Sequence, residues 1–171
     1  LSILTEGTGS VFVTVTTRGL STDASTELYD RGIRVRRSWQ RADGTALDPE
    51  QLRVGDLIKA TVTCTALGDR NALLHNIAIV DALPAGVEAE NPRLATSARP
   101  CSDTKSFADR VEYRDDRVLI FATVGVKPLE FEHYLRVVSA GTFTVPPIEA
   151  TSMYDTAIAS LAGGGSMTSR P

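Results

Sequence analysis

The fold is decided by the stretch Tyr134-Leu-Arg-Val-Val-Ser-Ala-Gly-Thr-Phe-Thr-Val-Pro-Pro-Ile-Glu-Ala-Thr-Ser-Met-Tyr154. A strand-like segment runs into the turn residue Gly141, and a second short apolar alternation follows it. Because proline cannot donate to a strand ladder, Pro146-Pro147 is expected to end that second strand. The sequence therefore predicts that residues 148–155 leave the sheet, with the Met-Tyr pair in a connection.

The same period-2 alternation recurs along the rest of the chain. Candidate strands, rich in β-branched residues and separated by Gly, Pro and Asp, cover residues 11–16, 33–39, 58–66, 72–83, 118–126 and 131–138. The segment 72–83 is nearly continuously apolar, which suits a strand buried on both faces or a core strand of a sandwich. Only residues 106–110 and 155–161 could hold one or two short helical turns. This pattern predicts an all-β fold, an antiparallel β-sandwich.

The alternation also predicts which side chains form the core. We expect Trp39 to be at least partly buried, and a core that includes Val13, Val62, Ile77, Ile79, Val124 and Leu135. The chain of 171 residues is long enough for one domain, which we assign to residues 1–162. The Gly-Gly-Gly-Ser run that follows predicts a flexible tail over residues 163–171.

Composition excludes several classes of partner. A net charge of −3 gives no electrostatic reason to expect nucleic acid or an anionic membrane surface. The apolar runs are too short to span a bilayer, so direct membrane insertion is not expected. The chain opens at Leu1 without a basic and apolar leader, so we expect it to be excised from a longer polypeptide whose targeting signal lies outside this fragment.

No constellation of residues indicates catalysis. The two histidines, His75 and His133, each lie in a predicted strand without neighbouring metal-ligand spacing. No glycine-rich loop opens a helix, and no nucleophile elbow occurs, so we expect neither a cofactor nor a bound metal. Asp115-Asp116 is interpreted as a charged hairpin turn rather than as paired catalytic carboxylates. The sequence predicts a non-enzyme.

Arginines concentrate between positions 31 and 41, where five occur in eleven residues: Arg31, Arg34, Arg36, Arg37 and Arg41. Nucleic-acid binding would require interleaved aromatics and a basic domain. We interpret the cluster as a strand face that is either solvated or turned toward the carboxylates of a neighbouring domain.

Several segments, in order, resemble the C-terminal macroglobulin domain of bacterial alpha-2-macroglobulins. They are Gly9-Ser-Val-Phe-Val-Thr-Val15, Gly32-Ile-Arg-Val-Arg-Arg37, Val54-Gly-Asp-Leu-Ile-Lys59, the segment 76–94, Val111-Glu-Tyr-Arg-Asp-Asp-Arg-Val118 and the segment 141–154. The resemblance covers residues 7–160 and implies a macroglobulin-like or fibronectin-III-like sandwich. The family's thioester motif, Cys-Gly-Glu-Gln, is absent here because it belongs to a separate domain.

The resemblance also implies a function. Members of this family are periplasmic or cell-surface traps: a protease cuts them, the body rearranges, and the protease is caged. The implied partners are the thioester domain, the neighbouring macroglobulin domains of the same chain and the trapped proteases. A loop carrying Met153 and Tyr154 is implied to shield the thioester. The family often has an acidic residue just before this pair, whereas Thr151-Ser152 stand here.

Two questions stay open at this stage. Cys64 and Cys101 are a disulfide candidate, because a periplasmic location favours pairing, and the alternative is a buried free Cys64 with an exposed Cys101 thiol. The alternative function is a β-sandwich stalk or interaction module of a bacterial surface adhesin, since residues 79–87 also resemble such modules. A carbohydrate-binding sandwich is disfavoured by the few aromatics.

Overall fold

The computed structural model describes residues 3–4, 6–16, 27–68, 73–90 and 108–171. Its strands are β1 Tyr29–Arg31, β2 Ile33–Arg41, β3 Leu52–Arg53, β4 Leu57–Ala66, β5 Leu74–Ala82, β6 Val87–Glu90, β7 Ala108–Tyr113, β8 Arg117–Val124, β9 Leu129–Val137, β10 Gly141–Val145, β11 Ile148–Ser152, β12 Ala159–Ala162 and β13 Gly165–Arg170. The predicted all-β class is confirmed. Within the described ranges no helix is present, and so none that is long and apolar enough to cross a membrane.

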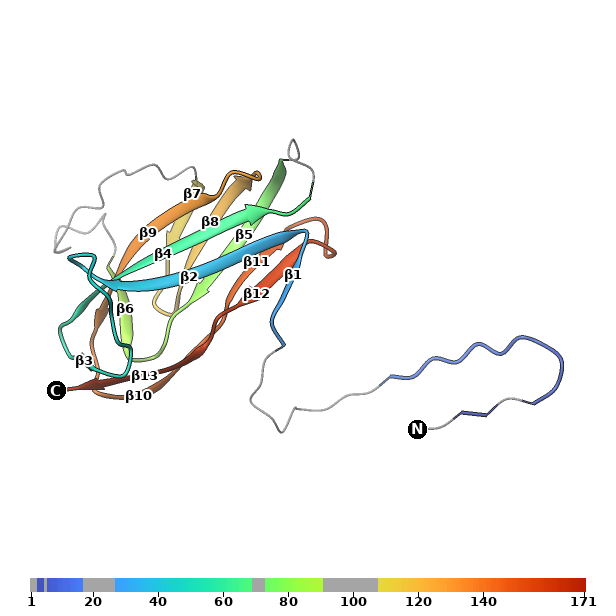
Figure 1. Cartoon of the computed structure of the whole chain (residues 1–171), viewed down its shortest axis with the longest axis horizontal. Coiled ribbons are helices and arrows are strands. Elements are labelled where there is room, and N and C mark those ends of the chain that lie inside the picture. Colours follow the sequence, from blue (N-terminus) through green and yellow to red (C-terminus); the bar gives the residue numbers. More distant parts are fainter. Residues whose placement is uncertain (1–2, 5, 17–26, 69–72, 91–107) are drawn as a thin grey trace.

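The strands form three sheets (Figure 1). A six-stranded sheet has the order β1-β12-β11-β5-β8-β7, a four-stranded sheet β2-β4-β9-β6, and a three-stranded sheet β10-β13-β3. All pairings are antiparallel except that of β13 with β3. Figure 1 shows the four-stranded sheet lying over the six-stranded one, with the three-stranded sheet at the lower end beside the C-terminus.

Alternation along the central strands builds the sandwich. Every second residue of β4, from Ile58 to Ala66, is buried, and β9 alternates in the same way. Because facing side chains of the two large sheets pack together, this period places one apolar row of each strand inside. A second cluster packs between the four-stranded and three-stranded sheets and includes Leu52, Ile58, Leu135 and Met167.

Most of the predicted core is confirmed. The residues found fully buried are Val62, Ile77, Ile79, Val124 and Leu135. Trp39 is partly buried against the second cluster, as predicted. The prediction for Val13 is wrong: its side chain is 52% exposed, and residues 11–16 belong to no strand. Figure 1 shows this blue segment extending away from the sandwich, so its alternation lacks a partner strand among the described residues.

The C-terminal residues are strand and not a flexible tail, so that prediction is wrong. β13 pairs with β10 from Gly165↔Val145 to Ser169↔Gly141. Met167 is fully buried, and the hydroxyl of Ser169 donates to the carbonyl of Ser139 over 2.6 Å. Composition misled because glycine and serine are also compatible with a strand that is paired on both sides, as β13 is with β10 and β3.

The predicted helical turns are also wrong. Residues 108–110 begin β7, and residues 159–161 belong to β12, while residues 106–107 lie outside the described part of the chain. Between β11 and β12 the chain makes a hydrogen-bonded turn, in which the Ile158 amide donates to the Asp155 carbonyl over 3.1 Å. A single turn of this kind reverses two paired strands without any helix.

A buried ionic cluster joins the sheets. Arg37 of β2 donates from Nη1 to Oδ1 of Asp81 on β5 over 2.5 Å, and from Nη2 to the carbonyl of Pro146 over 2.7 Å. Nε2 of His133 on β9 lies 3.1 Å from Oδ2 of Asp81, although the two atoms are not aligned as a hydrogen bond. Burial acts to raise the pKa of Asp81, but the contacts with His133 and Arg37 outweigh it and hold that pKa below its usual value.

The burial of Met167 gives a first prediction. Met167→Ala should lower the free energy of unfolding by about 2–5 kcal/mol, because it leaves a cavity between the four-stranded and three-stranded sheets. The other methionine of the chain, Met153, is 54% exposed, so Met153→Ala is the matched control and should change stability by less than about 0.5 kcal/mol. Urea unfolding measures both. Equal midpoints for Met167→Ala and wild type would show that β13 does not contribute to the core.

The ionic cluster gives a second prediction. Asp81→Asn should lower the free energy of unfolding by about 3–5 kcal/mol at neutral pH, because it leaves the buried Arg37 without its counter-charge. The difference should shrink as the pH falls below about 4, since the folded pKa is lowered and the contribution is lost on protonation. Asp116→Asn, which changes an exposed carboxylate, should leave the urea midpoint nearly unchanged at every pH. A wild-type midpoint for Asp81→Asn would contradict a structural role for the cluster.

Candidate functional site

Met153 and Tyr154 lie at the exposed tip of the β11–β12 connection. Their exposed fractions are 54% and 81%. Pro146-Pro147 ends its strand as predicted, because β10 stops at Val145. The prediction that the next residues leave the sheet is wrong for 148–152, which form β11 and pair with β5 from Ile148↔Asp81 to Ser152↔Ile77. The two prolines instead carry the chain from the three-stranded sheet to the six-stranded sheet. Only the turn after Ser152 leaves the ladder.

The backbone of this turn is fixed at several points. The Met153 amide donates to the carbonyl of Asn76 on β5 over 3.0 Å. Asn76 sits at an irregularity of β5 with a φ of 56°, a left-handed conformation that asparagine tolerates better than most residues. The Ser152 amide donates to the carbonyl of Ile158 over 3.0 Å, and Ile158 packs against the core. The turn is therefore a continuation of the sheet and not a loose loop.

The exposure of Tyr154 decides how its side chain is used. A tyrosine corner, in which the ring folds back and its hydroxyl bonds to the backbone of its own sandwich, requires a largely covered ring. At 81% exposure Tyr154 has no such cover, and Met153 beside it is also more than half exposed. This domain therefore leaves two large neighbouring side chains uncovered on a fixed turn.

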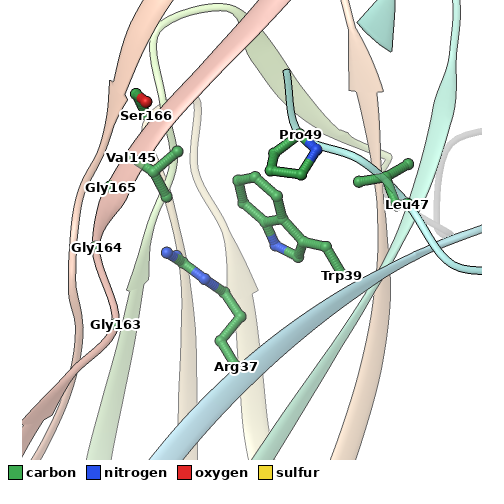
Figure 2. A pocket seen from close by; sticks show the side chains of 9 residues that line it. All are labelled: Arg37, Trp39, Leu47, Pro49, Val145, Gly163, Gly164, Gly165 and Ser166. Carbon is green, nitrogen blue, oxygen red and sulfur yellow. The ribbon is translucent and has the colours of Figure 1, made fainter. Parts of the chain in front are cut away.

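A pocket of about 270 Å³ opens beside the ionic cluster, and Figure 2 shows its lining. The indole of Trp39 stands between Arg37 and Pro49, and the guanidinium carbon of Arg37 lies 5.0 Å from the ring centroid. The backbone of Gly163–Gly165 passes along one side, where a Cβ at Gly163 or Gly165 would meet nothing within 4 Å. The charge of Arg37 is already compensated by Asp81, so the pocket is less suited to an ionic ligand than its arginine suggests.

The arginines of β2 have different environments. Arg34 and Arg36 both contact Asp30, at 3.2 Å and 2.6 Å, and remain about half exposed. These contacts, first of all the hydrogen bond from Arg36, hold the pKa of Asp30 well below its usual range. Arg37 is 6% exposed and belongs to the buried cluster, so it was wrongly assigned to the solvated face. The interpretation of the arginine-rich strand as an outward charged face therefore holds for Arg34 and Arg36 but not for Arg37.

The remaining polar candidates are structural where the chain is described. Asp115-Asp116 forms the tip of the β7–β8 hairpin, closed by the Arg114 amide donating to the Arg117 carbonyl over 2.9 Å. The predicted charged turn is thus confirmed. His75 is exposed, and its Nδ1 lies 3.3 Å from the hydroxyl of Thr123. Among the described residues no group of three His, Cys, Asp or Glu side chains could hold a metal ion.

Cys64 lies on β4 in the core between the two large sheets. It is a free thiol in this structure, and burial raises its pKa to about 12. Cys101 lies outside the described residues. The pairing of the two cysteines therefore stays a prediction.

Comparison with known proteins is consistent with this architecture. The family model of the bacterial alpha-2-macroglobulin MG10 domain matches residues 32–156. An alpha-2-macroglobulin of Pasteurella multocida is 31% identical over 140 residues, which is 82% of this chain and 7% of the relative. The chain belongs to the bacterial alpha-2-macroglobulin family. An alpha-2-macroglobulin of Rickettsia conorii is 28% identical over 73% of this chain and 6% of its own.

Solved alpha-2-macroglobulin structures share the fold. One is the Escherichia coli alpha-2-macroglobulin activated by porcine elastase, with a TM-score of 0.76 and 26% identity over 86% of this chain and 14% of that one. Another is the Salmonella alpha-2-macroglobulin reacted with methylamine, with a TM-score of 0.74 and 26% identity over 86% of this chain and 10% of that one. The chain thus spans a small part of each of these relatives. The family comprises protease inhibitors rather than enzymes, and the adhesin alternative loses its support.

Thiol titration supplies a third prediction. If Cys64 and Cys101 are paired, denatured and unreduced protein should show no titratable thiol. In native, reduced protein Cys64 should resist a thiol reagent, since it is fully buried and its thiolate is suppressed. Two thiols in the denatured, unreduced protein would rule the bridge out. Rapid labelling of Cys64 in the native state would contradict its placement in the core.

Proposed function

We propose that this chain is a non-catalytic terminal macroglobulin domain of a protease-trapping bacterial alpha-2-macroglobulin. It packs on the thioester domain of the same parent chain, and Met153 and Tyr154 cover the reactive bond until a protease cuts the parent. The observation that carries the proposal is the exposed Met-Tyr pair on a fixed turn of a macroglobulin domain.

The chemistry of the pair suits a removable lid. A thioester exposed to water hydrolyses, so its cover must exclude water from one side. The flat ring of tyrosine supplies apolar area with a polar edge, and methionine adapts to an irregular surface. Neither side chain carries an amine or a thiol, the groups that attack a thioester most readily.

The proposal includes a place and a set of partners. The thioester domain and the other macroglobulin domains of the parent are the direct contacts, and proteases are partners of the whole trap. The short spans that this chain covers in its relatives are consistent with one domain among many. We place the parent in the periplasm or on the cell surface, as the resemblance to bacterial alpha-2-macroglobulins implies.

A fourth prediction tests the lid. In the full-length parent, Tyr154→Ala should accelerate reaction of the thioester with methylamine before any protease is added, because the bond loses its cover. The rate is followed by the mass gained by the intact protein. In this isolated chain the same change should leave the urea midpoint almost unchanged, since the ring is 81% exposed.

Two results would count against the proposal. One is a Tyr154→Ala parent that reacts with methylamine at the wild-type rate. The other is a wild-type parent that takes up no methylamine even after proteolysis, which would mean that it holds no thioester to cover. Phe143→Ala is a useful comparison, because Phe143 packs against the second core cluster and its loss should affect stability instead.

A further inference from the structure

The hydroxyl of Ser152 holds the backbone that carries the Met-Tyr pair, and we infer that Ser152 is a positioning residue that fixes the direction of Tyr154. The inference rests on the proposed function, because it concerns how the lid is aimed. It adds a residue that neither the sequence motif nor the exposure of the pair points to.

Ser152 stands where the sheet ends and the turn begins. It is the last residue of β11 and is paired with Ile77 of β5. Its Oγ accepts from the amide of Tyr154 over 3.4 Å and from the amide of Asp155 over 3.2 Å. One oxygen of a sheet residue thereby fixes the two residues that follow Met153. A serine hydroxyl at the start of such a turn takes the place of a backbone acceptor.

The other contacts of the turn do not replace this one. Met153 is held separately, by its amide on the carbonyl of Asn76. Farther along, the carboxylate of Asp155 accepts from the amide of Ala157 over 3.0 Å, and the Asp155 carbonyl accepts from Ile158. Removal of the Ser152 hydroxyl therefore frees the amides of Tyr154 and Asp155 while both ends of the turn remain anchored.

Direction matters because only one rotation of the Tyr154 backbone places its ring on a given surface. The side chain itself is 81% exposed, so no packing inside this domain selects its orientation. The backbone hydrogen bond is then the part of this domain that limits where the ring can point. Without this hydrogen bond the Tyr154 side chain itself is unchanged, but it occupies the position over the thioester for a smaller fraction of the time.

The test compares methylamine uptake by the full-length parent carrying Ser152→Ala, Ser152→Asp, Tyr154→Ala or Ser152→Ala with Tyr154→Ala. Ser152→Ala should accelerate uptake about fivefold, which corresponds to the loss of one ordinary hydrogen bond. Ser152→Asp keeps a hydrogen-bond acceptor at the same place, so this variant should react at the wild-type rate. The double variant should react no faster than Tyr154→Ala alone, because Ser152 acts only through Tyr154. Ser38→Ala, at an exposed serine of β2, is the control for serine removal.

The results separate the inference from the proposed function. If Tyr154→Ala accelerates uptake and Ser152→Ala does not, the positioning role is overturned and the lid stands. The positioning role is also overturned if the effects add in the double variant, or if Ser152→Asp reacts as fast as Ser152→Ala. If Tyr154→Ala itself reacts at the wild-type rate, the lid proposal fails, and the positioning role fails with it. Amide exchange adds a direct readout: Ser152→Ala should speed exchange at Tyr154 and Asp155 more than at Met153, and uniform exchange would contradict the mechanism.

Discussion

The rest of the structure depends on the buried contact between Arg37 and Asp81. A guanidinium and a carboxylate taken out of water are stable only if each finds its counter-charge and its hydrogen bonds, so the positions of their strands are tightly constrained. Asp81 belongs to the six-stranded sheet and Arg37 to the four-stranded one. The same guanidinium holds the carbonyl of Pro146, at the point where the chain leaves the three-stranded sheet. One side chain thus relates all three sheets.

This constraint extends to the exposed turn through the register of β11. Ile148, two residues after the held carbonyl of Pro146, pairs with Asp81, and four residues later Ser152 pairs with Ile77. A slip of one residue would turn every side chain of β11 to the other face and separate the Met153 amide from the carbonyl of Asn76. The charge pair in the core and the turn at the surface are opposite ends of the same strand pairing. The turn can be rigid because the pairing behind it cannot shift.

How much of this the sequence predicts depends on whether the deciding signal is local. Alternation correctly predicted the central strands and the burial of Ile77, Ile79 and Leu135. A period-2 pattern of burial can be recognised from residues that are neighbours in the sequence. It failed for Val13, whose alternation is equally regular but has no partner strand among the described residues. The interpretation failed again for β11 and β13. Pro-Pro and Gly-Gly-Gly were interpreted as the end of the sheet structure, but at each of them the chain passes from one sheet to another and continues as a strand. The acceptor role of Ser152 depends on the path of the turn, which no spacing of residues reveals.

A fixed turn would also allow a small contact to serve as the proposed lid, which must later come off. Ordering a free loop on a partner costs about 1–2 kcal/mol for each residue whose backbone becomes fixed. In the turn after Ser152 that ordering is completed on folding, so contact with a partner has to immobilise only two side chains, at about 0.5–1.5 kcal/mol each. For the proposed lid, the apolar area of one tyrosine and one methionine therefore has less ordering cost to offset. It remains small enough for a rearrangement of the whole trap to remove it, which a contact large enough to order a free loop would resist.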